Sequence, residues 1–219
     1  MTVLAPLHFA DAREAAALAA FLTRLVHYDR AAAVRLQAGG GALAVFGRPP
    51  SFEVLAIRTA RLVDAVDLDV TVSAGELLDG IEESAGKAVV PDAVTGPPWA
   101  GVLPPRGGWE PVPGLPDAAG MRGAVAAAVT EFRARDEELP EERRTRTERE
   151  ALGRAIWSRT LGATGLPLRA VHAAQSLGFL PPGDAPVALF ASGPWLRLRT
   201  PYGSIALRTV PMALGVAPR

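Results

Sequence analysis

Residues 34–59 read VRLQAGGGALAVFGRPPSFEVLAIRT, and residues 187–209 read VALFASGPWLRLRTPYGSIALRT. Both stretches alternate apolar and polar residues around glycine turns, a pattern that predicts a three-strand antiparallel meander in each. With three gaps, nine positions are identical: Val34/Val187, Leu36/Leu189, Ala38/Ala191, Gly40/Gly193, Leu43/Leu196, Pro50/Pro201, Ala56/Ala206, Arg58/Arg208 and Thr59/Thr209. Duplication explains this match, and so does the resemblance of any two meanders made of β-forming residues and turn glycines.

A helix is predicted immediately before each meander. Asp11 and Glu14 have the spacing of a capping box, and an apolar stripe at helical spacing follows them up to about His27. Before the second meander, Pro167 suits the first turn of a helix that Gly178 ends. The sequence therefore predicts an α+β fold of two helix-plus-antiparallel-meander units, which have three helices and a proline-rich strap between them.

The strap covers residues 91–116, a window that holds 8 of the 20 prolines, 5 glycines and two tryptophans. Proline removes backbone donors and fixes φ, so regular structure is not expected there. Trp99 and Trp109 argue against a solvated linker, because their rings need a surface to pack on. The predicted organisation is an N-terminal α+β unit at 1–90, the strap, and a C-terminal helical plus β-meander unit at 117–219.

Composition narrows the classes of function. The chain lacks cysteine, so a disulfide framework, a thiolate zinc site and a cysteine nucleophile are excluded. It has no signal-peptide pattern at Met1–Ala10 and no apolar run of the roughly 20 residues that a membrane span needs. We expect a soluble cytoplasmic protein. Residues 1–142 carry 12 basic and 20 acidic groups, whereas residues 143–219 carry 11 and 3, a split that suits nucleic acid, an acidic partner or attraction between the halves.

Motifs for catalysis and for cofactors are missing. The sequence contains no G-x-S-x-G elbow and no P-loop lysine after Gly39-Gly40-Gly41, and its three histidines are far apart. Asp67 and Asp69 alternate along a predicted strand, which is compatible with a magnesium or calcium site, but a solvated strand face is the favoured interpretation because simple alternation already explains the pattern. We predict no metal, no cofactor and no catalytic residue.

The strongest candidate site lies in the basic C-terminal third. A helix at 147–161, a glycine turn, a helix at 166–177 and a hairpin follow the order of a winged helix. Side chains of the second helix and two arginines on one face of the hairpin are able to donate hydrogen bonds to phosphates or base edges. The predicted nucleic-acid-binding residues are Arg169, His172, Gln175, Ser176, Arg197 and Arg199.

By elimination, the sequence favours a non-catalytic binding or assembly protein that acts through protein–protein contacts, including self-association into a homo-oligomer. Trp99 and Trp109 are its candidate partner-contact or strap residues. The first alternative is a nucleic-acid-binding protein that uses the basic third in a winged-helix-like manner. The second alternative is an enzyme with the 91–116 loop as its lid, although the missing motifs weigh against catalysis.

Overall fold

The computed structural model describes residues 6–95 and 103–209. The strands are β1 (Leu7–His8), β2 (Ala33–Gly39), β3 (Ala42–Gly47), β4 (Leu55–Arg61), β5 (Leu68–Ser73), β6 (Ile81–Glu82), β7 (Lys87–Ala88), β8 (Glu110–Val112), β9 (Ala188–Ser192), β10 (Trp195–Thr200) and β11 (Gly203–Arg208). The helices are α1 (Ala12–Tyr28), α2 (Ala74–Asp79), α3 (Ala118–Glu138), α4 (Arg146–Trp157) and α5 (Leu168–Ser176), with a 3₁₀ turn at Glu141–Arg143.

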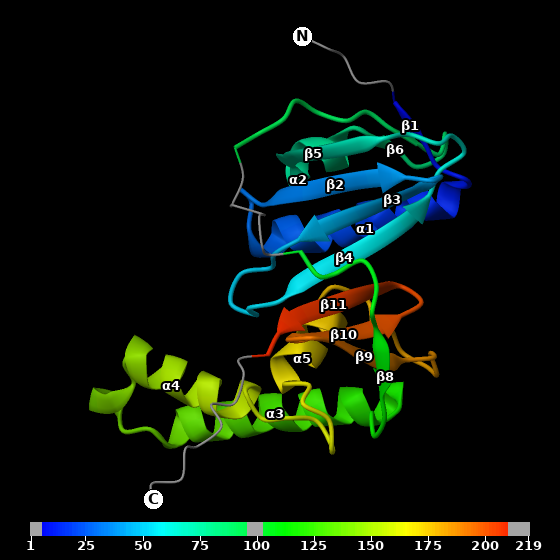
Figure 1. The fold of residues 1–219 in the computed structure, drawn as a ribbon. Helices are drawn as coiled ribbons and strands as arrows, with labels where there is room; N and C mark the ends of the chain where they lie inside the picture. The colour runs from blue at the N-terminus through cyan, green and yellow to red at the C-terminus, as the bar shows by residue number, and fades with distance from the viewer. Residues whose placement is uncertain (1–5, 96–102, 210–219) are drawn as a thin grey trace, which may run out of the picture.

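Both predicted meanders form, and they join into one sheet (Figure 1). Its eight strands lie in the order β5-β2-β3-β4-β11-β10-β9-β8, and every pairing is antiparallel. The β2–β3–β4 meander follows α1, and the β9–β10–β11 meander follows α5. The α+β architecture of two helix-plus-meander units is therefore confirmed. The strands β4 and β11 make the seam between the units.

The strand registers show how closely the two meanders correspond. Adding 153 to each residue number of β2 and β3 reproduces the pairing of β9 with β10, so Leu36↔Val45 matches Leu189↔Leu198. The turn glycines Gly40 and Gly193 also correspond, with φ of 59° and 52°. The first five identities of the sequence alignment are thus confirmed.

The third strands were aligned wrongly in the sequence. Adding 147 to each number of β4 reproduces the pairing of β10 with β11, so Ala56 corresponds to Gly203 and Arg61 to Arg208. The sequence alignment instead paired Ala56 with Ala206, which lies on the other face of the sheet. The cause is an insertion, because eight residues (48–55) separate the pair Gly47↔Ala56, whereas two separate Thr200↔Gly203.

The inserted loop also sets the start of the third strand, because β4 begins only at Leu55. Ser51 and Glu53 have positive φ of 68° and 53°, a backbone conformation that is incompatible with a strand. The α2 helix ends at Asp79, where the backbone N–H of Gly80 closes its last turn. In the described part of the strap, residues 110–112 form β8, which pairs with β9 at the edge of the sheet.

The helices pack on one face of the sheet. In Figure 1, α1 lies behind β3 and β4, and α5 lies behind β11. The main core is formed by their apolar stripes and the inward side chains of the strands, such as Leu22, Leu36, Met121, Val171 and Leu198, all with 0% exposure. Within the described ranges, no helix combines the length and apolar character required to cross a membrane.

Candidate functional site: the open face of the sheet

The face of the sheet that points away from the helices is here called the open face. Strand alternation places a second, smaller apolar cluster on it. Its buried members are Phe46, Leu55, Ile57, Trp195 and Ala206. These residues come from β3, β4, β10 and β11, so the cluster straddles the seam between the two units. No second layer of secondary structure covers it within the part of the chain that the structure describes.

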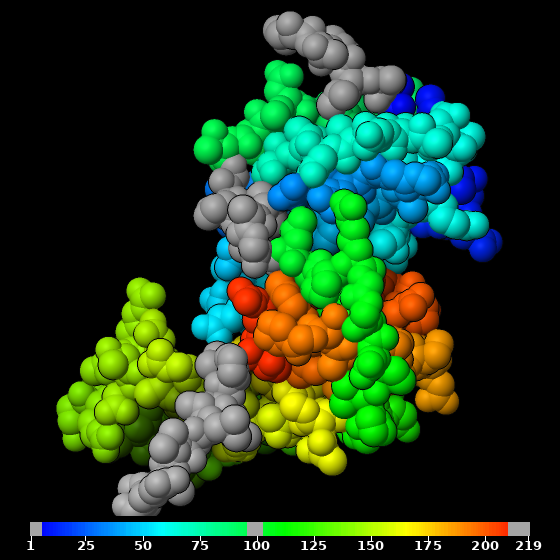
Figure 2. Space-filling model, in the orientation of Figure 1, coloured from blue at the N-terminus to red at the C-terminus, as the bar shows by residue number. Residues whose placement is uncertain are grey.

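An extended piece of the strap, residues 103–109, crosses this face, and we call it the crossing segment. Leu103 and Trp109 pack against the apolar cluster. The Trp109 indole N–H donates a hydrogen bond to the carbonyl of Pro105, at 3.0 Å, which holds the turn of the segment. Figure 2 shows this green chain passing in front of the strands. Trp109 is half-buried, and Trp99, the other predicted contact residue, lies outside the described residues.

Two depressions flank the crossing segment. The first, of about 670 Å³, is here called the Arg197 depression, and its walls include Trp109, Val187, Phe190, Arg197 and Arg199. The second, of about 640 Å³, is called the Arg106 depression, and it extends over β2 and β3 towards the segment. Thr59 and Arg197 line both depressions, so they lie at the point where the two meet.

Arg197 is the charged group at the centre of this face. Its Nη2 donates to the Ser204 hydroxyl at 3.2 Å, and its guanidinium carbon lies 5.8 Å from the centre of the Trp109 ring. Its buried Nε has no hydrogen-bond partner. Burial, followed by repulsion from Arg199, lowers the pKa of Arg197 from its ordinary value. A guanidinium remains protonated even so, and a buried cation of this kind favours an anionic neighbour.

Elsewhere on the open face, the carboxylate of Asp69 is already paired. Asp69 of β5 accepts from Arg35 at 2.7 and 2.8 Å and from Gln37 at 3.1 Å. These contacts, led by the Arg35 hydrogen bond, hold the pKa of Asp69 below its ordinary value. The carboxylate that suggested a cation site is thus engaged by a guanidinium. No group of three metal-ligating side chains occurs among residues 6–95 and 103–209.

The six residues predicted to bind nucleic acid fall into two groups on opposite sides of the sheet. Arg197 and Arg199 lie together on the open face, as their spacing predicts. Arg169, His172, Gln175 and Ser176 lie on α5, which packs on the helix-covered side. The structure therefore does not bring the two groups together.

Two members of the α5 group contact neighbouring elements. Arg169 is 3.5 Å from a Glu53 carboxylate oxygen. The His172 ring stacks on Trp157, with centroids 4.4 Å apart, and meets the edge of Phe52 at 5.2 Å. Burial among these rings lowers the pKa of His172. Gln175 is exposed and Ser176 is half-buried. Glu53 and Phe52 belong to the inserted loop of the N-terminal unit. The contacts of Arg169 with Glu53 and of His172 with Phe52 therefore link the two units.

The arginines of the α4 region meet acids close by. Arg149 pairs with Asp136 at 2.7 Å, and Arg159 binds Glu131 through two nitrogens, at 2.5 and 2.8 Å. Both acids lie on α3, within the net-acidic part of the sequence. Part of the charge difference between the acidic and the basic part of the chain is thus neutralised by ion pairs between α3 and the α4 region. Exposed pairs of this kind contribute little to stability, because solvent screens the charges.

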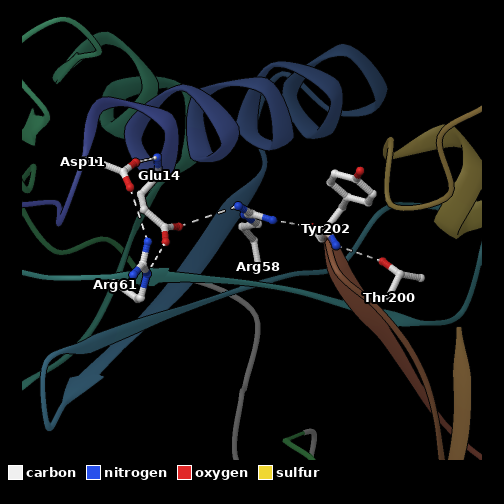
Figure 3. Close-up of polar contacts among 6 residues, drawn as sticks. All are labelled: Asp11, Glu14, Arg58, Arg61, Thr200 and Tyr202. Carbon is white, nitrogen blue, oxygen red and sulfur yellow. Dashed lines mark hydrogen bonds and ion pairs between the residues drawn. The ribbon is translucent and has the colours of Figure 1, made fainter. Parts of the chain in front are cut away.

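A second charged cluster, at the seam, is closed by internal partners (Figure 3). Glu14 of α1 accepts from Arg61 at 2.8 Å and lies 3.8 Å from Arg58. Arg58 Nη1 donates to the carbonyl of Tyr202 at 2.6 Å, and Tyr202 belongs to the turn between β10 and β11. Burial lowers the pKa of Arg58, and the charge of Glu14 opposes that shift. This cluster links the two units, and its charges are already satisfied by internal partners. The open face therefore remains the candidate site.

Comparison with known proteins divides the chain between residues 101 and 104. Residues 3–101 match the family model of a domain of unknown function, DUF8010, and residues 104–212 match that of a second domain of unknown function, DUF8185. No curated protein matches the chain. The crystal structure of the DNA polymerase sliding clamp from Pseudomonas aeruginosa is similar, with a TM-score of 0.47 and 13% identity, covering 98% of this chain and 68% of the clamp chain.

Proposed function

We propose that this protein is a non-catalytic binding protein, and that its open face docks an extended segment of a protein partner. The observation that carries the proposal is the pair of depressions that flank the crossing segment on the open face, beside the apolar cluster at the seam. The two depressions beside the segment have the volume of ligand sites, which is about 300–1,000 Å³.

The chemistry of the lining supports binding over catalysis. Neither depression is lined by a histidine, and the single carboxylate in the two linings is Asp67. Proton transfer near neutral pH needs a group with a suitable pKa in reach of the substrate. The hydroxyls of Thr59 and Ser204 have no base beside them among the residues that line these depressions. The lining offers apolar walls, hydroxyls and guanidiniums, which are recognition groups.

The charges favour a protein partner over nucleic acid. Nucleic-acid affinity comes largely from many arginines and lysines that contact successive phosphates. On the open face, Arg35 is paired with Asp69, whereas Arg61 is held by Glu14 of α1 and the α5 group lies on the other side. Arg197 and Arg199 lie beside aromatic walls, with Arg106 on the crossing segment and Arg208 over the Trp195 ring. A local anchor of this type suits a peptide better than a polyanionic backbone.

Selection of displayed peptides tests the proposal. Random twelve-residue peptides on phage are panned against the immobilised full chain, and the enriched pool is then tested on variants. We expect Phe190→Ser, which removes an aromatic wall of the Arg197 depression, to lose most of the binding. The matched control is Val63→Ser, because Val63 is 66% exposed and lines neither depression.

Thermal melts show whether each variant is folded. Equal binding of the pool to the wild type and to a folded Phe190→Ser protein would contradict the proposal. A mobility shift with nucleic acid in the absence of any peptide enrichment would favour the alternative. If the enriched partner is a second copy of the chain, the same variant shifts the oligomeric state in solution.

A further inference from the structure

Three half-buried arginines in this protein have an Nε atom that is buried without a hydrogen-bond partner: Arg58, Arg169 and Arg197. Two of them face a carboxylate, since Arg58 lies 3.8 Å from Glu14 and Arg169 lies 3.5 Å from Glu53. Arg197 has no carboxylate within 4.0 Å among the described residues, and the rest of the chain contains no Asp or Glu. Burying a guanidinium without a counter-charge costs free energy. An anion that binds beside it lowers this cost, and the free energy gained contributes to the affinity for the anion.

The neighbour of Arg197 adds to this positive charge. Arg199 is two residues further along β10 and therefore on the same face, and it also lines the Arg197 depression. No acidic side chain lines that depression. The hydroxyls of Ser204 and Thr59 supply further donors in the same wall. The site thus combines two cations with neutral donors.

The fold itself does not require these arginines. In the register of the two meanders, Arg197 corresponds to Ala44 and Arg199 to Phe46, because Gln37↔Ala44 and Arg35↔Phe46 match Phe190↔Arg197 and Ala188↔Arg199. The N-terminal unit forms the same hairpin with an alanine and a phenylalanine there. The first unit thus shows that apolar residues at these two positions are enough to form the hairpin. The second unit carries arginines there.

The neighbouring groups limit the size of the anion. The Arg106 depression, which meets the site at Arg197, is lined by Asp67 near β5 as well as by Arg106, so it offers a polyanion no continuous row of cations. Trp109 and Phe190 wall the site with apolar surface. A carboxylate on a peptide side chain satisfies both conditions, since it brings one negative charge on an apolar stem. Arginine binds carboxylates through two parallel N–H···O bonds, which gives such a contact direction as well as strength.

We propose that Arg197 and Arg199 form a recognition site for an aspartate or glutamate side chain of the partner segment. The proposal rests on the function proposed above and adds the identity of the anchoring residue. Within this site, the Arg197 side chain is half-buried and the Arg199 side chain is exposed. Trp109 lies over the Arg197 guanidinium, so it reports on occupancy.

The experiment is an NMR titration of the arginine Nε–H signals in the full chain. The probe is N-acetyl-glutamate N-methylamide, and its isosteric control is the glutamine analogue. Inorganic phosphate and octathymidylate are titrated in parallel. We expect the glutamate probe to shift the Arg197 signal saturably and the glutamine probe to leave it unchanged. Arg199→Gln should weaken this binding about tenfold, in line with the loss of one charge-assisted hydrogen bond.

Three variants separate recognition from folding. Arg199 is exposed, so Arg199→Gln should leave the melting temperature unchanged. Arg197→Ala introduces the residue found at the equivalent position 44, and it should abolish the response of the Trp109 indole N–H signal to the glutamate probe while the protein still folds. Arg35→Gln removes an arginine of the same face that Asp69 already neutralises, and it should leave the titration unaffected.

The outcomes distinguish this inference from the proposed function. If selected peptides bind the open face but tolerate exchange of every acid for its amide, the function stands and the carboxylate site is wrong. If neither the glutamate probe nor any acidic peptide shifts Arg197, the site is also wrong. Tighter saturable binding of phosphate or octathymidylate than of the glutamate probe overturns it in favour of nucleic acid.

Discussion

Ile57 of β4 lies directly opposite Ser204 of β11, and the two residues hold equivalent positions in the two meanders. The pseudo-twofold axis of the molecule therefore passes through this pair. On either side of the pair, the sheet repeats itself outwards as three meander strands and one added edge strand. The edge strands break the symmetry of chain order, because β5 follows its meander and β8 precedes its own.

The shared core predicts one cooperative unfolding transition. Leu43 and Leu196 are equivalent residues, and both belong to the core cluster that extends through the two units. Replacing either one with alanine should lower the free energy of unfolding by about 2–5 kcal/mol. Urea denaturation, followed by far-ultraviolet circular dichroism and by tryptophan fluorescence, checks this. Two separated transitions in either variant would show that the units unfold independently.

Because Gly203 has no side chain, the ring of Phe179 is able to pack against the backbone of β11 at this position. A Cβ atom at this position would lie 2.6 Å from ring atoms of Phe179. Phe179 in turn stacks on Phe21 of α1, with centroids 5.4 Å apart, so it has little room to move. We expect Gly203→Ala to destabilise the protein by about 1–3 kcal/mol, the usual range for overpacking. Chemical denaturation measures the loss.

Gly123→Ala serves as the control for that substitution. Nothing lies within 4 Å of a Cβ at Gly123, and this residue is within α3. Alanine is the better helix former, so the control should be neutral or stabilising by up to about 1 kcal/mol. Equal effects of the two substitutions would contradict the role assigned to Phe179.

The two arginines that bind Glu14 should differ in their contribution to stability. The Arg58 side chain is 12% exposed and holds the Tyr202 carbonyl, whereas that of Arg61 is 70% exposed. Arg58→Gln should cost on the order of 1–3 kcal/mol, because it removes the mostly buried donor of the Tyr202 carbonyl and the positive charge beside Glu14. Arg61→Gln should cost less, since solvent screens that pair. Thermal melts at low and at high salt compare them, and the reverse order would sink this assignment.

His172 should make stability depend on pH. Its pKa is lowered in the folded state, so the unfolded chain binds a proton more readily. The free energy of unfolding should therefore fall as pH drops below the unfolded value of about 6.5 and continue to fall down to the folded pKa. Denaturation curves between pH 7.5 and 5, compared with those of His172→Phe, measure the dependence. An unchanged pH dependence in His172→Phe would contradict this prediction.

Much of the fold could be predicted from local patterns. Alternation and turn glycines identified both hairpins and the matching of Leu36 with Leu189, because these signals lie within one strand and its turn. The third strands were misaligned because Phe52 and Val54 read as strand residues. They are in fact buried side chains of a loop whose backbone conformation the sequence does not reveal.

The candidate site could be predicted only in part. The spacing of Arg197 and Arg199 places them on one face of a strand, which is a local fact. Whether that face is shared with α5 depends on how the sheet and helices stack, and nothing in the linear order fixes this. The contact between Trp109 and Arg197 is likewise set by the course of the crossing segment, which no periodic pattern describes.

The seam between β4 and β11 has a consequence for synthesis on the ribosome. β4 emerges early, whereas its partner is the last strand of the sheet to leave the exit tunnel. Until then, one row of β4 amide and carbonyl groups has no strand to pair with, and an unpaired edge of this kind recruits other nascent chains. Newly made N-terminal units are thus exposed to mispairing on polysomes, and a chaperone that shields the β4 edge would raise the yield of native protein.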